Sequence, residues 1–139
     1  MVEFDAAIKR EWHFKQLKWA LQALAIPASD QRQLFPEGVA VADELALDFE
    51  HSAAVVRGSY VEELSNPQVT RLADIDEILN RISRTGADFK PELWAELALG
   101  SSQHWAEIRH RAAVALDAFG WSVELPPRNP QERGTTFVR

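Results

Sequence analysis

The chain of 139 residues contains no cysteine. Disulfides, thiolate catalysis and cysteine-ligated zinc are therefore excluded, and the fold must be held together by buried apolar side chains. A chain of this length can bury a sufficient core without covalent or metal cross-links. We expect one compact helical domain over residues 1–120, followed by a C-terminal tail over 121–139. The absence of cysteine is compatible with a reducing compartment, and we predict a cytoplasmic protein.

Signals for export or membrane insertion are also missing. The N-terminal segment MVEFDAAIKREWHF lacks a basic region followed by an apolar run. No stretch approaches the roughly 20 apolar residues that a membrane-spanning helix needs. We therefore expect a soluble chain with no membrane partner.

The sequence has few glycines and histidines, and neither type falls in a catalytic pattern. The six glycines form no P-loop, dinucleotide-binding or Gly-x-Ser-x-Gly motif. The four histidines show neither His-x-x-x-His nor His-Glu-x-x-His spacing. We expect no cofactor, no metal site and no enzymatic activity.

Basic residues are scarce in the central third of the chain. Residues 36–80 contain only Arg57 and Arg71 against ten acidic residues, whereas the segments on either side are nearly balanced. The central third therefore carries a charge of −8, more than the −6 of the whole chain. Such a surface repels nucleic acid and accelerates encounters with a basic partner. The alternative is that it is a solvated surface that keeps a small protein soluble.

Apolar residues recur at helical spacing along most of the chain, and proline, glycine and serine separate the periodic segments. The pattern predicts an all-α, compact bundle of about five helices with an irregular or short extended C-terminal tail. Asn66-Pro67 is expected to start the third helix and Gly86 to end it, while Gly58 and Gly120 are expected to end the second and fifth. The expected helices span about 3–25, 39–57, 67–85, 91–99 and 102–119.

The first expected helix has two apolar stripes on nearly opposite sides. The first stripe is suited to a bundle core, and the second needs separate cover, from the tail, from another helix or from a partner. Trp12 and Trp19 on the second stripe are candidate binding residues, because tryptophan is prominent in interface energetics. Trp94, Trp105 and Trp121 are expected to fill the core. The first stripe contains Phe14, Leu17, Leu21 and Leu24, and the second Phe4, Ile8, Trp12 and Trp19.

The segment ADELALDFEH, residues 42–51, places Glu44, Asp48 and His51 in one sector of the second helix, apart from the buried Leu45 and Phe49. Two carboxylates and an imidazole could bind a divalent metal or act as acid and base. One helix rarely forms such a site alone, and the Glu-x-x-His pairs of di-iron bundles are missing. We interpret this sector first as a docking surface.

A metal-dependent hydrolase is the alternative. The all-α NTP pyrophosphohydrolases hold magnesium between helices that carry acidic clusters, and Asp74 and Glu77 could supply ligands from the next helix. The order Asp43-Glu44, Asp48, Asp74, Glu77 departs from the Glu-Glu-x-x-Glu and Glu-x-x-Asp runs of those enzymes. Asp74 and Glu77 are also expected on an outer, solvated face that points away from a partner helix.

The sequence favours a non-enzymatic protein-binding module. Its most concrete form is a bacterial immunity protein that neutralises a cognate, basic toxin through an acidic surface. A self-associating structural or adaptor protein, with a second copy bound through the N-terminal helix, is the other alternative. The predicted partner-binding residues are Asp43, Glu44, Asp48, Glu50, His51, Glu62, Glu63, Trp12 and Trp19.

Overall fold

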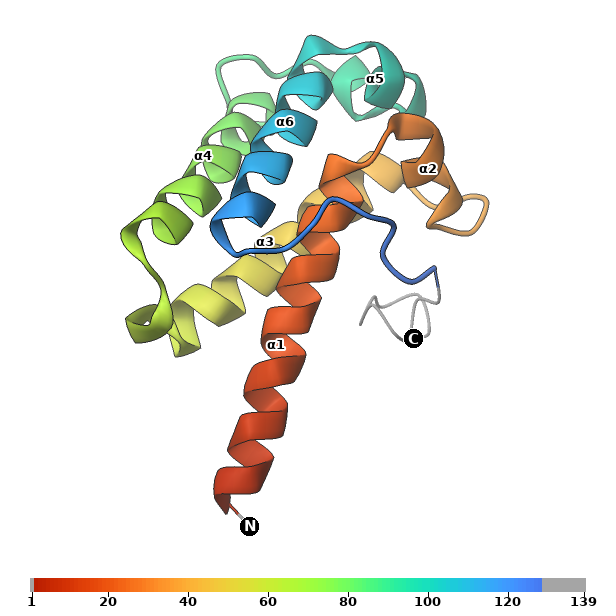
Figure 1. The fold of residues 1–139 in the computed structure, drawn as a ribbon. Helices are drawn as coiled ribbons and strands as arrows, with labels where there is room; N and C mark the ends of the chain where they lie inside the picture. Colours follow the sequence, from red (N-terminus) through yellow and green to blue (C-terminus); the bar gives the residue numbers. More distant parts are fainter. Residues whose placement is uncertain (1, 129–139) are drawn as a thin grey trace.

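The computed structural model describes residues 2–128, with side chains from residue 5 onward, and this part of the chain is an all-α bundle (Figure 1). No strand occurs within the described residues. The prediction of an all-α fold is confirmed. The α-helices are α1 Val2–Ala25, α2 Ala28–Gln33, α3 Val41–Ser59, α4 Asn66–Ile82, α5 Glu96–Ser101 and α6 Gln103–Ala118, and the short 3-10 helices are η1 Val61–Glu63 and η2 Pro91–Trp94.

The long helix α1 organises the bundle, because it packs against both α3 and α6, while α4 packs mainly against α6. The N-terminal half of α1 extends beyond the other helices (Figure 1). Residues 5–9 on this half are all exposed, whereas the second half carries fully buried Leu17, Leu21 and Leu24. Only part of α1 therefore belongs to the core.

The buried faces of the other helices follow the expected helical spacing. Val69 is an exception: it has the same spacing as the buried residues of α4 but is 38% exposed, because it lies in the first turn of α4 at the edge of the bundle. The shared core consists of Leu45, Phe49, Ala53 and Val56 from α3, Leu72, Ile75, Ile78, Leu79 and Ile82 from α4, and Trp105, Ile108, Ala112, Ala115 and Leu116 from α6.

The helix caps lie one residue from two of the predicted positions. Ser65, not Asn66, caps α4: its Oγ accepts a hydrogen bond from the N–H of Gln68, and the Gln68 side chain accepts one from the N–H of Ser65. Ser102, the first residue of the expected helix, instead caps α6 by accepting hydrogen bonds from the N–H groups of His104 and Trp105. A serine hydroxyl that satisfies free N–H groups in the first turn stabilises a helix start by about 1 kcal/mol.

The predicted helix over 91–99 is wrong as one element. It is divided into η2 and α5, because Ala95 adopts an extended conformation with φ −78° and ψ 152°. Gly100, expected after this helix, lies within α5. The break aims Trp94 and Trp105 at each other, with ring centroids 5.8 Å apart and planes at 90°.

Of the three glycines expected to end helices, only Gly120 does so in the predicted way. With φ 74°, it lets the N–H of Trp121 donate to the carbonyl of Leu116 at 2.9 Å, and Trp121 then stacks on Phe119. Gly58 lies within α3, which continues to Ser59. Gly86 lies four residues after the end of α4, where a turn packs its backbone against the carbonyls of Asn80 and Arg81.

Three tryptophans were expected in the core, and the structure buries them to different degrees. Trp105 is fully buried, while Trp94 and Trp121 are partly buried and pack against the core. The indole N–H groups of Trp105 and Trp94 both donate to backbone carbonyls. Trp105 donates to Leu93 at 2.7 Å, and Trp94 donates to Ile82 at 2.8 Å. These bonds satisfy the polar atoms that burial would otherwise leave unpaired.

The described part of the predicted tail, residues 121–128, is extended and crosses α1 (Figure 1). Gln22 of α1 donates to the carbonyl of Ser122, and Arg128 donates to the carbonyl of Gln33 in α2. Pro126 is buried. The tail therefore packs on the helices as far as it is described, and the expectation for the segment TTFVR falls outside the described residues.

Membrane insertion finds no support in the helices of residues 2–128. None of them is both long and apolar enough to cross a bilayer.

Gly86 and Gly58, which do not end helices as expected, give a paired prediction about stability. A Cβ at position 86 would overlap the Asn80 and Arg81 carbonyls, so Gly86→Ala should destabilise the protein by roughly 1–3 kcal/mol. A Cβ at position 58 meets nothing within 4 Å, so Gly58→Ala should stabilise the protein by about 0.5–1 kcal/mol through helix propensity. Urea unfolding measures both. Equal effects of the two substitutions would contradict this account of the α4 turn.

Candidate functional site

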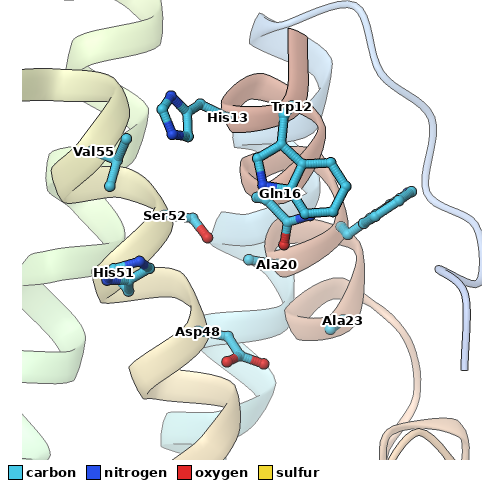
Figure 2. Close-up of a pocket in the computed structure, with 10 residues that line it drawn as sticks. Trp12, His13, Gln16, Ala20, Ala23, Asp48, His51, Ser52 and Val55 are labelled. Carbon is cyan, nitrogen blue, oxygen red and sulfur yellow. The ribbon is translucent and has the colours of Figure 1, made fainter. Parts of the chain in front are cut away.

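A cleft of about 150 Å³ separates α1 from α3 (Figure 2). Four of the predicted binding residues line it: Trp12 and Trp19 from α1, and Asp48 and His51 from α3. These two pairs lie about 30 residues apart in the sequence and were predicted from different patterns, so the packing of α1 on α3 brings them together. The remaining lining residues are His13, Gln16, Ala20, Ala23, Ser52 and Val55.

The wall formed by α1 is aromatic at its outer end. Trp12 is 43% exposed, and its ring meets that of Trp19 edge to face, with centroids 6.4 Å apart. The ammonium of Lys15 lies over the Trp19 ring at 5.8 Å. Within the described residues no side-chain cation lies over the Trp12 ring, so Trp12 keeps an aromatic surface open to a ligand.

The wall formed by α3 is polar. Asp48 and Ser52 are one helical turn apart and point toward α1 (Figure 2). Ser52 is only 8% exposed, and its hydroxyl has no hydrogen-bond partner among residues 2–128. Among the described residues, the buried side-chain atom without a partner is Gln31 Oε1, so the Ser52 oxygen remains accessible from the cleft.

One end of the cleft is fixed by a polar contact between α1 and the end of α3. His13 Nδ1 lies 3.0 Å from the hydroxyl of Tyr60, and the Tyr60 ring also packs against Phe14. These contacts hold the middle of α1 at a set distance from α3. The cleft is therefore present without a ligand.

The acidic residues of α3 do not form one surface. Asp43 and Glu50 lie on the outward, exposed face with Leu47, whereas Asp48 and His51 line the cleft. Glu44 shares their sector but precedes the cleft by one turn. Within the described residues, no group of three or more histidine, aspartate or glutamate side chains is arranged to hold a metal ion.

Glu63 and Asp76, two acids of the central third, are paired with basic residues, one from α1 and one from the same segment. Arg10 of α1 donates to Glu63 at 2.6 Å, and Asp76 pairs with Arg57. Glu62, beside Glu63 in η1, is exposed. The charge of −8 in this segment is therefore spread over several local environments.

The outer face of α4 is exposed to solvent, as expected, with the side chains of Asp74 and Glu77 42% and 52% accessible, but it also contacts α6. Arg111 of α6 donates to Glu77 Oε1 at 2.7 Å and to the carbonyl of Asp74 at 2.7 Å. The hydrogen bond from Arg111 lowers the pKa of Glu77, and the nearby Arg81 lowers it further. Glu77 thus joins α4 to α6 and does not face α3.

Sequence reasoning missed the inner part of the cleft. Gln16, Ser52 and Val55 line the cleft but are not among the predicted binding residues. Ser52 carried a signal, because it is a polar residue at i+4 from Asp48 within an otherwise apolar sector. Ser52 faces Gln16 and Trp12 across the cleft because α1 and α3 cross there, and no local sequence pattern encodes that crossing.

Glu50 on the outward face gives a pH-dependent prediction. Partial burial, together with the nearby Asp76 carboxylate, raises the pKa of Glu50 above its ordinary value of 4.5. The folded state therefore favours the protonated form, and stability is lost as the pH rises from 4.5 through the folded-state pKa. Glu50→Gln should increase stability at pH 7 by up to about 0.5 kcal/mol and leave it unchanged below pH 4. Urea midpoints at both pH values test this, with Asp43→Asn as the control on the same face; a Glu50→Gln gain of equal size at both values would contradict it.

Comparison with known proteins adds no relative from which a function could be transferred. No protein-family model, no curated protein and no solved structure matches the chain. Since a helical bundle supports many unrelated functions, the function has to be argued from the site itself.

Proposed function

We propose that this chain is a non-enzymatic module that binds a basic protein partner in the cleft between α1 and α3. The observation that carries the proposal is the convergence of Trp12 and Trp19 with Asp48 and His51 on one cleft. Its most concrete form is a cytoplasmic bacterial immunity protein that neutralises a toxin enzyme. The nine residues predicted for partner binding divide into these four, which contact the partner in the cleft, and five acids around it.

The surroundings of the cleft support an interface. Beyond Trp12, the projecting half of α1 exposes Ile8, which is 51% accessible. Large apolar side chains next to polar ones are typical of docking surfaces, and buried tryptophan often dominates their energetics. The exposed parts of Trp12 and Ile8 are covered by nothing else in residues 2–128. A partner that covers them would remove this apolar surface of α1 from water.

The acids around the cleft contribute through long-range electrostatics. Asp43, Glu44, Glu50 and Glu62 lie outside the cleft on more than one face, and together they add a long-range negative potential that attracts a basic partner. Such charges increase the association rate more than the lifetime of a complex. Asp48 differs because it lines the cleft and would contact the bound partner directly.

The metal-dependent hydrolase has no supporting observation in the described residues. Glu77, one of its expected ligands, is bound to Arg111 of α6. Glu44, another, lies outside the cleft lining.

A genetic experiment tests the proposed function. Reading frames next to the one that encodes this chain are expressed alone and together with it, and growth is measured. We expect one neighbour to arrest growth and this chain to relieve the arrest. Asp48→Arg should abolish relief, because it places a positive charge where the basic partner docks.

The matched control is Glu92→Arg, which makes the same charge change on exposed η2, outside the cleft. It should relieve growth arrest as the original chain does. Relief by both variants would show that the cleft does not bind the partner, and absence of any arrested culture would count against the immunity function.

Self-association is the second candidate, and exposed Ile8 and Trp12 on the projecting half of α1 favour it. Light scattering across a range of protein concentrations distinguishes the two. The protein-binding proposal predicts a monomer whose mass is unchanged by Ile8→Ser. A dimer that Ile8→Ser dissociates would favour the self-associating alternative.

A further inference from the structure

The hydroxyl of Ser52 is a polar group of the cleft that the helical core does not explain. Its helix neighbours Leu45, Phe49 and Val56 fill the bundle, but Ser52 is turned to the edge of the buried sector and into the cleft (Figure 2). The Ser52 residue is only 8% exposed, and its hydroxyl, which bonds to no described residue, is accessible from the cleft and can accept a hydrogen bond from a ligand. The cleft is therefore suited to a polar ligand.

The size of the cleft limits that ligand. Sites for cofactors and drug-sized molecules usually enclose about 300–1,000 Å³. At about 150 Å³, this open cleft can enclose the end of one side chain, whereas a nucleotide or a folded peptide would lie mostly outside it. An occupant must therefore project from a larger partner.

The lining groups specify the charge of the occupant. Asp48 contributes a carboxylate, whose two oxygens have acceptor positions beyond the interaction that it already makes, and Ser52 contributes a hydroxyl oxygen that accepts hydrogen bonds. Trp12 offers the face of an indole ring, which attracts cations. Ala20 and Val55 supply apolar walls for an alkyl chain. Together these groups recognise a cation that has several N–H donors and an apolar stem.

We propose that the cleft accepts the side chain of a single arginine presented by the protein partner. A guanidinium group is planar, so it can stack on Trp12 while its edge donates to Asp48 and Ser52. A lysine ammonium is more strongly hydrated and cannot stack and donate along one edge in this way. Trp19 is the less suitable ring, because Lys15 already lies over it. This assignment rests on the proposed function and adds the chemistry of the group that the partner inserts.

The test uses the full chain and three short peptides, acetyl-Gly-Xaa-Gly-amide, in which Xaa is arginine, lysine or uncharged citrulline. Each is titrated into ¹⁵N-labelled protein, and nuclear magnetic resonance follows the Trp12 indole N–H and the amides of residues 48–52. We expect the arginine peptide to shift these signals with a millimolar dissociation constant. Lysine should bind at least about fivefold more weakly and citrulline more weakly still.

Variants locate the binding within the cleft. Asp48→Asn should weaken arginine binding about tenfold, and Ser52→Ala about threefold, because each removes an acceptor for the guanidinium. Ser52→Ala is expected to fold normally, because alanine favours helix. The rest of its spectrum should therefore match that of the original protein, which serves as the check on folding. Glu92→Gln, on exposed η2 and outside the cleft, is the control and should leave the arginine affinity unchanged.

Equal binding of arginine and citrulline, equal binding of arginine and lysine, or arginine binding that Asp48→Asn leaves unchanged would each overturn the assignment. The result is separable from the proposed function. If the arginine peptide shifts nothing while Asp48→Arg still abolishes relief of growth arrest, the cleft binds a partner through another group. If arginine binds in the cleft but no neighbouring protein is neutralised, the arginine site stands and the immunity function falls.

Discussion

The packing of the second half of α1 between α3 and α6 is the constraint on which the rest of the structure depends. Leu17, Leu21 and Leu24 are fully buried there, and each such side chain stabilises the fold by about 1.5–3 kcal/mol. The same contacts fix the position of the first half of α1, which has no such support and extends beyond the bundle (Figure 1). The cleft lies where the supported half meets the projecting half. It is thus a consequence of how the core is built.

Small residues explain why α1 and α3 leave a cleft where they meet. Ala20 and Ala23 on α1 are buried, and Ser52 faces them from α3. Larger side chains at these positions would fill the space and add apolar contacts. The sequence instead retains a polar, incompletely packed position close to the core. Real proteins depart from full packing and full hydrogen bonding mainly at functional sites, and this departure is the basis for reading the cleft as a binding site.

Much of the fold could be predicted from the sequence, because helical spacing and cap residues act locally. The stripe from Leu17 to Leu24, the buried face of α3 and the glycine turn after α6 all follow from neighbouring residues. The errors arose where tertiary packing overrides local signals. Gly86 follows a periodic segment, and this pattern predicts a helix end there. In the structure its backbone instead packs closely against the Asn80 and Arg81 carbonyls. At Ala95, likewise, the helical spacing of 91–99 continues through a residue whose backbone is extended, next to the contact between Trp94 and Trp105.

The candidate site could be predicted only in parts. Helical spacing alone placed Asp48 with His51 and Trp12 with Trp19, but the crossing of α1 and α3 decides that the two pairs meet. The central claim is that the cleft is a preformed guanidinium site. A crystal structure of the protein with guanidinium chloride, at a concentration well below that needed for unfolding, tests it most directly. We predict a guanidinium ion stacked on Trp12 within hydrogen-bonding distance of Asp48 and Ser52, and no such ion in the Asp48→Asn variant. An empty cleft in the original protein, or an ion at the same place in the variant, would contradict the account.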